Sequence, residues 1–409
     1  MNIILVNDFA YTNGGAGQIA LTTAQLLAEQ GHQTVLFTAV GPVAEELQHI
    51  SRLRVVCTHQ HDILHDPSRL RAVTYGIWNP VTRRAFAKLL QEFSPRDTVI
   101  HVHALQKAIS TSILPVAHQQ GFRVLFHLHD YGVACPNLGF FDYPAQKICH
   151  RRAMGMGCIL HNCDRRSYPQ KFWRVLRQYV QKKLGGLPTK TDAFAYISDY
   201  SLRFLKPYLP QASHLYYLPN PINAEHGPRV ETEKNQTYLF VGRLSKEKNP
   251  QLLARAAADL HLPVTFVGSG ELAEEIKQLN PNAKMAGWIS HDNLPDYYRK
   301  ARALVFPSIW GETLGLTALE AMAYGLPVIV SDECAAADEI VDGVTGLHFR
   351  NNDLDSFKQK IQMLQQDELV QNMSRQAYQD FWAKQKAKES YVQTLEKVYQ
   401  TELQSMSFL

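Results

Sequence analysis

The chain has 409 residues, which is enough for two domains of ordinary size. Hydrophobic residues make up 45% of it, a share that excludes wholesale disorder, and a net charge of +4 is no sign of a nucleic-acid partner. The charge is uneven, because residues 150–190 carry ten Lys or Arg against one acid, a local excess of +9 that leaves −5 for the rest.

The first half of the sequence alternates short apolar strands with helical stretches. A helix is expected over residues 17–30, closed by Gly31. This alternation predicts a parallel sheet covered by helices. The expected strands are NIILVN at 2–7, QTVLFTA at 33–39, LRVVC at 53–57, DTVIHVHA at 97–104 and FRVLFHLHD at 122–130.

The alternation restarts after a stretch at 218–236 that is rich in Pro, Asn and charge and is typical of a linker. The chain is therefore predicted to form two doubly wound α/β halves. Because ligands of such sheets lie beyond the carboxyl ends of the strands, the turns NGGAG and FVGRLSKEKNP are expected to meet across a cleft. The later strands are expected at TYLFVGRL (237–244), PVTFVGSG (263–270), AKMAGW (283–288), ALVFPS (303–308) and LPVIVSD (326–332).

The glycines of the opening stretch NDFAYTNGGAGQIA have the spacing of a dinucleotide-binding motif, from Gly15 through Gly17 to Ala20. Two observations speak against NAD. Seven residues separate the strand from Gly15, and no acid ends the second strand. A mobile surface loop is one alternative. We favour a helix N-terminus whose free N–H groups face an anionic ligand.

The second half carries charged side chains at strand ends. Arg243 and Lys248 follow a strand and suit a diphosphate, although a solvated turn would have the same composition. In WGETLGLTALEAMAYGLPVIVSD, Glu312 is expected to open a helix whose first turn holds Gly315. Glu320 would then lie two turns later on about the same face, so that both carboxylates could accept sugar hydroxyls.

These segments resemble the retaining glycosyltransferases of family 4, which have the GT-B fold of two Rossmann-like domains facing across a cleft. The resemblance implies a nucleoside-diphosphate sugar held mainly by the C-terminal half and an acceptor held by the N-terminal half. It also implies a terminal helix that crosses back onto the first domain. The matching segments are NGGAG, HLHDY, LPNPI, FVGRLSKEKNP, FVGSGEL, WGETLGLTALEAMAYGLPVIVSD and DEIVDGVTGLHF, in the family's order.

The resemblance divides the chain into an acceptor domain over 1–210, with a Cys-rich and basic insertion at 131–185, and a donor domain over 220–380. A helix at about 380–409 joins the first domain. The residues implied to be catalytic are His129, Arg243, Lys248 and Glu312. Those implied to bind the donor are Gly14, Gly15, Gly242, Arg243, Lys248, Gly287, Trp288, Glu312, Thr313, Leu314, Gly315, Leu316 and Glu320, and those on the acceptor side are Asn13, Asp130 and Tyr131.

The resemblance also implies a role for most of these residues. Arg243 and Lys248 would neutralise the leaving diphosphate, Glu312 would hold the transferred sugar, and Glu320 would hold the ribose. The turn at 287–288 would approach the base. One position departs from the family, which often has an aromatic residue where this chain has Leu314, so the shape of the sugar pocket stays open.

The mechanism is expected to need no metal. Asp353 and Asp355 match an Asp-x-Asp pattern, but they are interpreted as the cap and first turn of a helix. Cationic side chains and helix ends would stabilise the leaving diphosphate instead. The family's route is front-face transfer with retention, in which the departing phosphate takes the acceptor proton.

Four of the six cysteines cluster at Cys135, Cys149, Cys158 and Cys163. A structural zinc ion is one interpretation, with His150 and His161 as substitute ligands, although no C-x₂-C pair is present. Reduced packing thiols and disulfides are the alternatives. The paired histidines at 101 and 103 are expected to be polar groups of the core or cleft rather than ligands.

The basic segment at 168–184 is predicted to be an amphipathic helix. Its basic side would carry Lys171, Arg174 and Lys182, and its apolar side Trp173, Leu176, Val180 and Leu184. It could pack on its own domain, or it could dock on anionic lipid or a lipid-linked acceptor. Nucleic acid is not expected, since no recognition motif is present. Without a leader or an 18-residue apolar run, we expect a cytoplasmic protein, at most peripheral on the inner face of the membrane.

These features lead to the hypothesis of a retaining, metal-independent glycosyltransferase acting in the synthesis of a bacterial surface polysaccharide. A sugar-nucleotide epimerase or a glycoside phosphorylase of the same fold is an alternative. A zinc-stapled, membrane-associated scaffold is the alternative that is not an enzyme.

Overall fold

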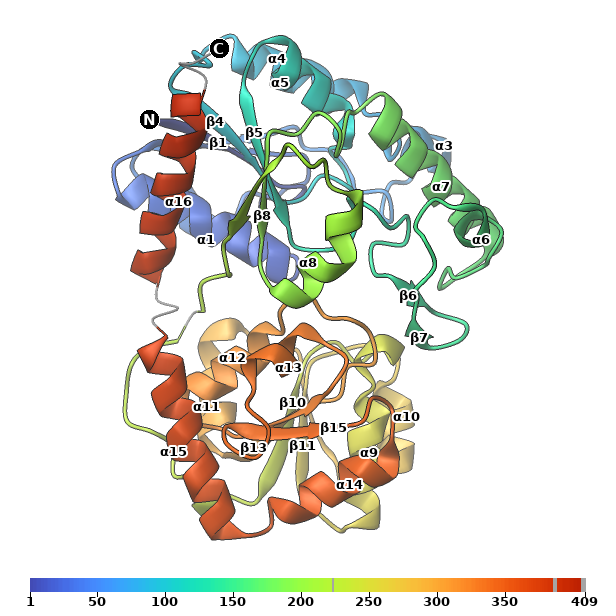
Figure 1. The fold of residues 1–409 in the computed structure, drawn as a ribbon, viewed down its shortest axis with the longest axis vertical. Coiled ribbons are helices and arrows are strands. Elements are labelled where there is room, and N and C mark those ends of the chain that lie inside the picture. Colours follow the sequence, from blue (N-terminus) through green and yellow to red (C-terminus); the bar gives the residue numbers. More distant parts are fainter. Residues whose placement is uncertain (223, 385–387, 406–409) are drawn as a thin grey trace. The chain divides into compact units, whose positions relative to one another are not determined.

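The computed structural model describes residues 1–222, 224–384 and 388–405, which form two compact units (Figure 1). The first unit comprises Met1–Gly139, Arg151–Pro221 and Lys388–Leu409, of which 406–409 lie outside the described residues. The second comprises Phe140–His150 and Ile222–Ala387. The insertion expected at 131–185 is therefore divided, because its hairpin Phe140–His150 groups with the second unit rather than the first.

The first unit contains a seven-stranded parallel sheet in the order β3-β2-β1-β4-β5-β8-β9. Its central strands are buried on both faces, which explains their continuous apolar runs. The strands are β1 (Asn2–Val6), β2 (Gln33–Thr38), β3 (Leu53–Cys57), β4 (Thr98–Val102), β5 (Arg123–Leu128), β8 (Ala193–Tyr196) and β9 (His214–Tyr217).

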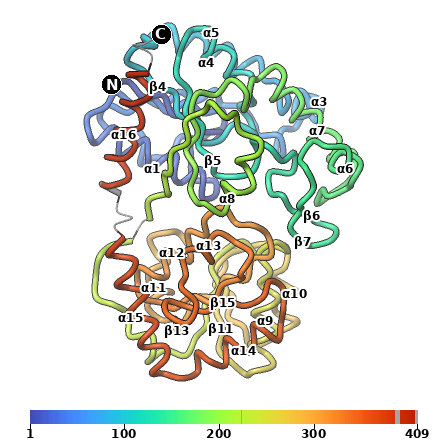
Figure 2. The backbone as a smooth tube through the Cα atoms, viewed as in Figure 1, coloured from blue at the N-terminus to red at the C-terminus, as the bar shows by residue number. Residues whose placement is uncertain are grey.

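Helices cover both faces of this sheet. On one face, α1 and α16 share a core with β1 and β4, and Figure 2 shows the chain returning to this unit for its last helix. The helix α1 ends where it was expected to end, with Gly31 at a φ of 91° just past the C-cap. The helices are α1 (Gly15–Glu29), α2 (Glu45–Gln48), α3 (Arg69–Tyr75), α4 (Pro80–Leu90), α5 (Leu114–Gln119), α6 (Met156–Ile159), α7 (Tyr168–Lys183), α8 (Asp199–Leu205) and α16 (Lys388–Gln404).

The second unit contains a six-stranded parallel sheet in the order β12-β11-β10-β13-β14-β15. A separate two-stranded hairpin joins β6 (Phe141–Asp142) to β7 (Lys147–Ile148). The strands of the large sheet are β10 (Thr237–Val241), β11 (Val264–Val267), β12 (Lys284–Gly287), β13 (Ala301–Phe306), β14 (Val328–Ser331) and β15 (Gly346–Phe349). The helices are α9 (Pro250–Asp259), α10 (Ala273–Leu279), α11 (Leu294–Arg299), α12 (Leu316–Ala323), α13 (Ala335–Glu339), α14 (Leu354–Met363) and α15 (Asp367–Ala383).

Both sheets reverse their strand order once, and this confirms the predicted fold class of two Rossmann-like, doubly wound α/β domains of the GT-B type. In the first unit the reversal falls between β1 and β4, and in the second between β10 and β13. Such a switch point is where doubly wound sheets bind ligands, because the loops beyond the two strands diverge there. Each unit therefore has one candidate site.

The predicted helical wheel of the basic segment is wrong. In α7, Lys171 is fully buried, whereas Leu176 and Leu184 of the expected apolar side are exposed. The physical reason is that backbone carbonyl groups line the surface beneath this helix. Polar side chains of α7 donate hydrogen bonds to them and are therefore on the buried face. The sequence pattern alone does not show which face of an amphipathic helix has partners.

Candidate functional site

The switch point of the second unit brings together two loops that are far apart in sequence. One follows β10 at 242–249 and the other follows β13 at 307–315. They are joined by a hydrogen bond from the Ile309 N–H to the Glu247 carbonyl oxygen, at 3.0 Å. Because β10 and β13 are adjacent parallel strands, residues after their carboxyl ends lie beside one another.

The two loops meet in a partly buried ion pair. The Lys248 ammonium donates a hydrogen bond to Glu312 Oε1, and the Ser308 hydroxyl donates to the same oxygen at 2.9 Å. The Lys248 Nζ also lies 5.7 and 5.8 Å from the ring centroids of Phe306 and Trp310. The predicted cation and carboxylate are thus held as one unit, in a partly desolvated setting where their charges are weakly screened.

Arg243 does not join this pair. Its side chain is 64% exposed, and its Nη1 lies 3.9 Å from Glu247 Oε1. The pKa of the nearby Cys334 thiol is raised to about 12, mainly by burial and then by the Glu312 carboxylate. This cysteine therefore stays neutral. The loop therefore presents one fixed cation, Lys248, and two exposed cations, Arg243 and Lys246.

The expectation that Glu312 opens a helix is wrong. The helix α12 begins at Leu316, its N-cap is Gly315, and Glu312 lies in the preceding loop. Gly315 has a φ of 89°, and a Cβ there would lie 2.8 Å from the Ala336 Cβ, so only glycine fits. No side chain caps α12, which leaves backbone N–H groups at its start able to meet an anion. Thr313 and Leu314 are buried in the same loop.

Glu320 lies further along α12 and is also buried. Its Oε1 is 3.0 Å from His291 Nε2, and its Oε2 accepts a hydrogen bond from the Tyr298 hydroxyl at 2.8 Å. The pKa of Tyr298 lies well above its usual range, mainly because the side chain is buried and then because Glu320 is close. The hydroxyl therefore remains a donor. Gly287, at the end of β12, and Trp288 are exposed.

Sequence reasoning missed four groups of this site, namely Ser308, Trp310, His291 and Tyr298. The first two belong to PSIWGET, so the strand-end position was a signal that could have found them. The other two lie in different elements from Glu320, and nothing in their spacing indicates that they meet it.

The switch point of the first unit is organised by Asp8, which sequence reasoning also missed. This buried carboxylate follows β1 and accepts hydrogen bonds from the backbone N–H groups of Lys107, Ala108 and Ile109, at 2.8 to 2.9 Å. These hydrogen bonds link the loop after β4 to the loop after β1. The predicted Asn13, Gly14 and Gly15 are exposed, and Gly14, with a φ of 83°, is the N-cap of α1.

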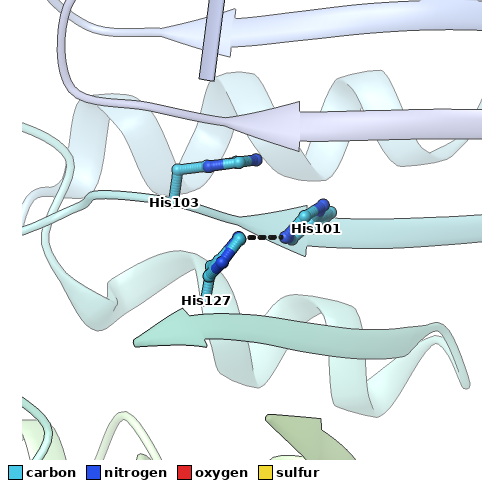
Figure 3. Close-up of side chains that lie close together, drawn as sticks. All are labelled: His101, His103 and His127. Carbon is cyan, nitrogen blue, oxygen red and sulfur yellow. Dashed lines mark hydrogen bonds between the residues drawn. The ribbon is translucent and has the colours of Figure 1, made fainter. Parts of the chain in front are cut away.

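Four histidines pack together beside this switch point, with His101 on β4, His103 just after it, His127 on β5 and His129 just after β5. Figure 3 shows His101, His103 and His127. Nε2 of His101 lies 3.2 Å from Nδ1 of His127, and Nδ1 of His103 lies 2.9 Å from Nε2 of His129. The Tyr399 hydroxyl of α16 is 2.7 Å from Nδ1 of His101.

Burial is the main cause that lowers the pKa of every histidine in this stack, with neighbouring histidines adding to the effect for His101, His103 and His129. The pKa of His127 falls to about 3. All four rings are therefore neutral at pH 7, and His129 carries no positive charge.

The residues after His129 were predicted to lie on the acceptor side. Asp130 Oδ1 accepts a hydrogen bond from the Gly132 N–H at 2.7 Å, and burial raises the pKa of its carboxyl despite nearby Arg177. Tyr131 is buried, and its ring packs edge-on against Phe204.

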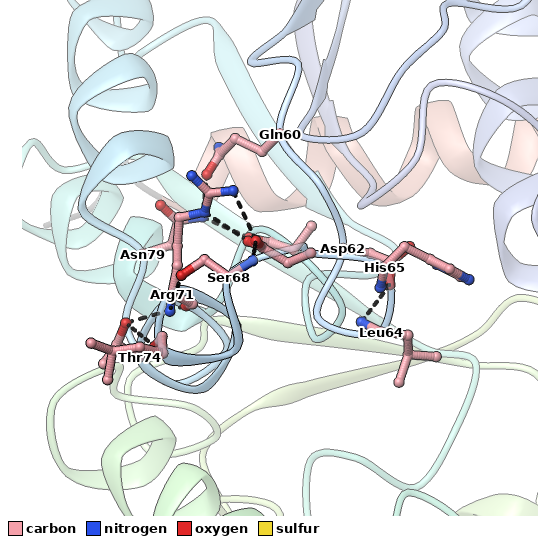
Figure 4. Close-up of polar contacts among 11 residues, drawn as sticks. Gln60, Asp62, Leu64, His65, Ser68, Arg71, Thr74 and Asn79 are labelled. Carbon is pink, nitrogen blue, oxygen red and sulfur yellow. Dashed lines mark hydrogen bonds and ion pairs between the residues drawn. The ribbon is translucent and has the colours of Figure 1, made fainter.

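A cavity of about 330 Å³ lies in the first unit near α3 and α4. Figure 4 shows Gln60, Arg71 and Asn79 of its wall. Asp66 and Arg71 form a two-pronged ion pair in its wall, at 2.8 Å for each contact. Asn79 Nδ2 donates to Gln60 Oε1 at 2.9 Å. Polar and apolar side chains share its lining, and no motif in the sequence indicated this cavity.

The four clustered cysteines are all buried thiols. Cys158 Sγ and Cys163 Sγ lie 3.5 and 3.1 Å from the Lys171 Nζ. Burial acts to lower the pKa of Lys171, but Cys163, Cys158 and Cys135 outweigh it and raise the pKa. Cys158 and Cys163 thus flank one buried ammonium group in the first unit. Cys149 belongs to the hairpin that groups with the second unit.

The site of the second unit lies in the part of the chain that matches a known family. The family model Glycosyl transferases group 1 matches residues 222–380. This segment is similar to the group 1 glycosyltransferases. The matched segment includes Lys248, Glu312 and Glu320 together with the whole sheet that positions them.

Curated relatives match over part of their length. A D-inositol 3-phosphate glycosyltransferase of Arthrobacter sp. (strain FB24) is 38% identical over 124 residues, covering 27% of this chain and 29% of that protein. An Escherichia coli UDP-Gal:alpha-D-GlcNAc-diphosphoundecaprenol alpha-1,3-galactosyltransferase is 32% identical over 162 residues, covering 35% and 40%. This chain thus spans well under half the length of these two relatives.

Solved structures match over the whole chain. A sucrose-phosphate synthase from Thermosynechococcus elongatus superposes with a TM-score of 0.75 at 20% identity, covering 99% of each chain. Anabaena HepE, solved in complex with UDP-glucose, superposes with a TM-score of 0.67 at 14% identity, covering 100% of each. At these identities the likeness establishes the fold.

Proposed function

We propose that this protein is a retaining glycosyltransferase that moves a sugar from a nucleoside-diphosphate sugar to a glycan or a lipid-linked acceptor. The observation that carries the proposal is the Lys248–Glu312 pair, held at the switch point beside the uncapped start of α12. A cation next to free backbone N–H groups suits a diphosphate, and an adjacent carboxylate suits sugar hydroxyls.

Each residue of the donor site has a proposed role. Lys248, Arg243 and the N–H groups at the start of α12 stabilise the charge that develops on the departing diphosphate. Glu312 accepts hydroxyls of the transferred sugar and keeps Lys248 in place, while Glu320 accepts those of the ribose. Gly242 and the turn at Gly287 and Trp288 let the nucleotide approach the backbone.

The proposed reaction proceeds with retention. The bond between the anomeric carbon and the phosphate oxygen breaks, and the acceptor hydroxyl forms the new bond on the same face. Its proton passes to the departing phosphate oxygen. No step is assigned to a metal, because Lys248 and Arg243 supply the positive charge, and Asp353 serves instead as the N-cap of α14, accepting the Ser356 N–H at 2.8 Å.

The acceptor is proposed to bind the first unit, near its switch point, with Asn13, His129 and Asp130 as hydrogen-bonding groups. The named substrate of the Escherichia coli relative is a diphosphoundecaprenol-linked sugar, which supports a role in bacterial surface polysaccharide synthesis. We place the protein in the cytoplasm, at the inner face of the membrane. Among the described residues, no helix is both long and apolar enough to cross a bilayer.

The first experiment is a thermal-shift screen against UDP-, GDP-, ADP- and CMP-sugars. A nucleotide sugar at 100 times its dissociation constant should stabilise the fold by about 2.7 kcal/mol. Lys248→Ala should abolish the shift, while Lys246→Ala, which removes an exposed lysine two residues earlier, should retain it. If no nucleotide shifts the folded protein, or if both variants respond alike, the proposed donor site is wrong.

The same screen with a chelator tests the proposed structural zinc. A melting temperature lowered by chelator alone, with the nucleotide shift retained, would support zinc at the cysteines and a metal-free reaction. Release of a free sugar or a requirement for inorganic phosphate would indicate the epimerase or phosphorylase alternative. A scaffold would keep its function after Glu312→Ala and Arg243→Ala.

A further inference from the structure

The helix α7 is attached to its domain by its polar side chains. Gln178 Nε2 donates hydrogen bonds to the carbonyl oxygens of Gly132 and Val133, at 3.2 and 2.9 Å, and Gln181 Nε2 donates to Gly132 at 3.0 Å. Arg177 adds a hydrogen bond to a neighbouring backbone carbonyl. These polar groups are buried, so the usual orientation of a surface helix is reversed.

The opposite face of α7 presents large apolar side chains to solvent. Tyr168, Phe172, Leu176 and Tyr179 are 40%, 59%, 44% and 55% exposed. Their spacings of four, four and three residues place them in one row along the helix. A row of this kind costs free energy in water at each side chain, and it has no role in holding the helix to its domain.

Two neighbouring helices also carry exposed apolar side chains. The Tyr168 hydroxyl donates to the Ile159 carbonyl oxygen at 3.1 Å, and Trp173 Nε1 donates to the Val73 carbonyl oxygen at 3.0 Å. These contacts place α6 and α3 beside α7, as Figure 1 also shows. We call the combined surface the α7 face; its added exposed members are Met156, Leu160, Leu70 and Val73.

Positive charge surrounds the α7 face. Lys182, Lys183 and Arg166 are exposed on or next to α7. The single acid of residues 150–190, Asp164, is buried and lies 2.9 Å from Arg174 Nε, so it does not offset the exposed cations. An apolar row with two tyrosines and a cationic border matches the interfacial region of a bilayer that carries anionic headgroups.

We propose that the α7 face docks the protein on the surface of an anionic lipid bilayer. The four side chains of the row enter the boundary between headgroups and acyl chains, and Lys182 and Lys183 bind lipid phosphates. This inference deepens the membrane location proposed above, and it rests on the surface of the first unit rather than on the reaction.

The test is co-sedimentation of the full-length protein with vesicles of phosphatidylethanolamine and phosphatidylglycerol, and with vesicles of phosphatidylcholine alone. The protein should pellet with the anionic vesicles and largely stay in solution with the neutral ones. Lys182→Gln/Lys183→Gln should weaken binding about thirtyfold, since each basic residue near an anionic surface contributes about 1 kcal/mol. High salt should weaken binding of the unmodified protein as well.

A matched pair of substitutions tests the apolar row. Leu176→Glu should weaken vesicle binding at least tenfold, whereas Met363→Glu, at a comparably exposed leucine-sized side chain of α14, should leave it unchanged. Equal binding by the two variants would overturn the proposal, as would no binding by the unmodified protein at low salt. Self-association that Leu176→Glu abolishes, without vesicle binding, would also overturn it and assign the face to a second copy.

The nucleotide thermal shift of the same variants distinguishes a failure of the membrane-docking proposal from a failure of the proposed transferase function. Leu176→Glu should retain the full shift, because the substitution is in the first unit and the donor residues are in the second. Vesicle binding without any nucleotide shift would support the α7 face and contradict the transferase.

Discussion

Acidification should destabilise the first unit through its histidine stack. His101, His103 and His127 are almost completely buried and neutral when the protein is folded, whereas the unfolded chain protonates them near pH 6.5. The unfolded state therefore binds more protons below pH 6.5, and stability falls as the pH falls. Between pH 7.5 and 5.5 each such histidine costs about 1.4 kcal/mol, and with His129, whose pKa is also lowered by burial, the stack of four costs about 5.5 kcal/mol.

Hydrogen exchange of the β4 and β5 amides, corrected for the intrinsic pH dependence of exchange, measures the opening free energy of this sheet alone. His127→Gln should remove about one quarter of the pH-dependent loss, whatever pH-independent destabilisation it also causes. His49→Gln, at an exposed position of the same unit, should leave the loss as it is. A loss below about 1 kcal/mol, or one unchanged by His127→Gln, would refute the reasoning.

Three further predictions concern the second unit. Glu233→Gln should lower the unfolding free energy of this unit by about 1–3 kcal/mol at pH 7, because Arg229 holds the pKa of Glu233 at about 2. In thermal melts this loss should shrink from pH 4.5 down to about pH 2, because the unfolded chain protonates its Glu233 there while the native carboxylate stays ionised, and a pH-independent loss would contradict it. Gly315→Ala should lower the unfolding free energy by about 1–3 kcal/mol and weaken nucleotide binding, since the positive φ and close packing of Gly315 exclude a Cβ. An unchanged melting temperature would contradict this prediction. Tyr298→Phe should lower the unfolding free energy measured in urea by about 1–2 kcal/mol, because it removes a hydrogen-bond donor to the buried Glu320. An unchanged urea midpoint would contradict this and mean that the carboxylate finds another partner.

The fold was predictable because its signals are local. Runs of β-branched and aromatic residues such as NIILVN and ALVFPS were buried parallel strands, as their continuous hydrophobicity indicated. Gly31 and Asp353 ended and began helices where the capping rules place them. The order of strands across each sheet was not predicted, because pairing depends on contacts between distant segments.

The candidate site was predictable only in part. Lys248 and Glu312 were identified from motifs, but their ion pair depends on β10 and β13 being neighbours. Glu312 was misplaced at a helix start because periodicity does not reveal the left-handed turn at Gly315. Asp8 left no recognisable signal, since its three partners are backbone N–H groups about a hundred residues away.

The sequence by itself determined the fold class, the linker between the halves and the charged residues at strand ends, because each follows from local periodicity or a short motif. Only the tertiary structure decided which face of α7 is buried. Its glutamines met unpaired carbonyls at Gly132 and Val133, and burying those carbonyls without donors would cost more than exposing Phe172 and Leu176. An amphipathic pattern shows that a helix has two faces, and the hydrogen-bonding needs of its neighbours select the face that is buried.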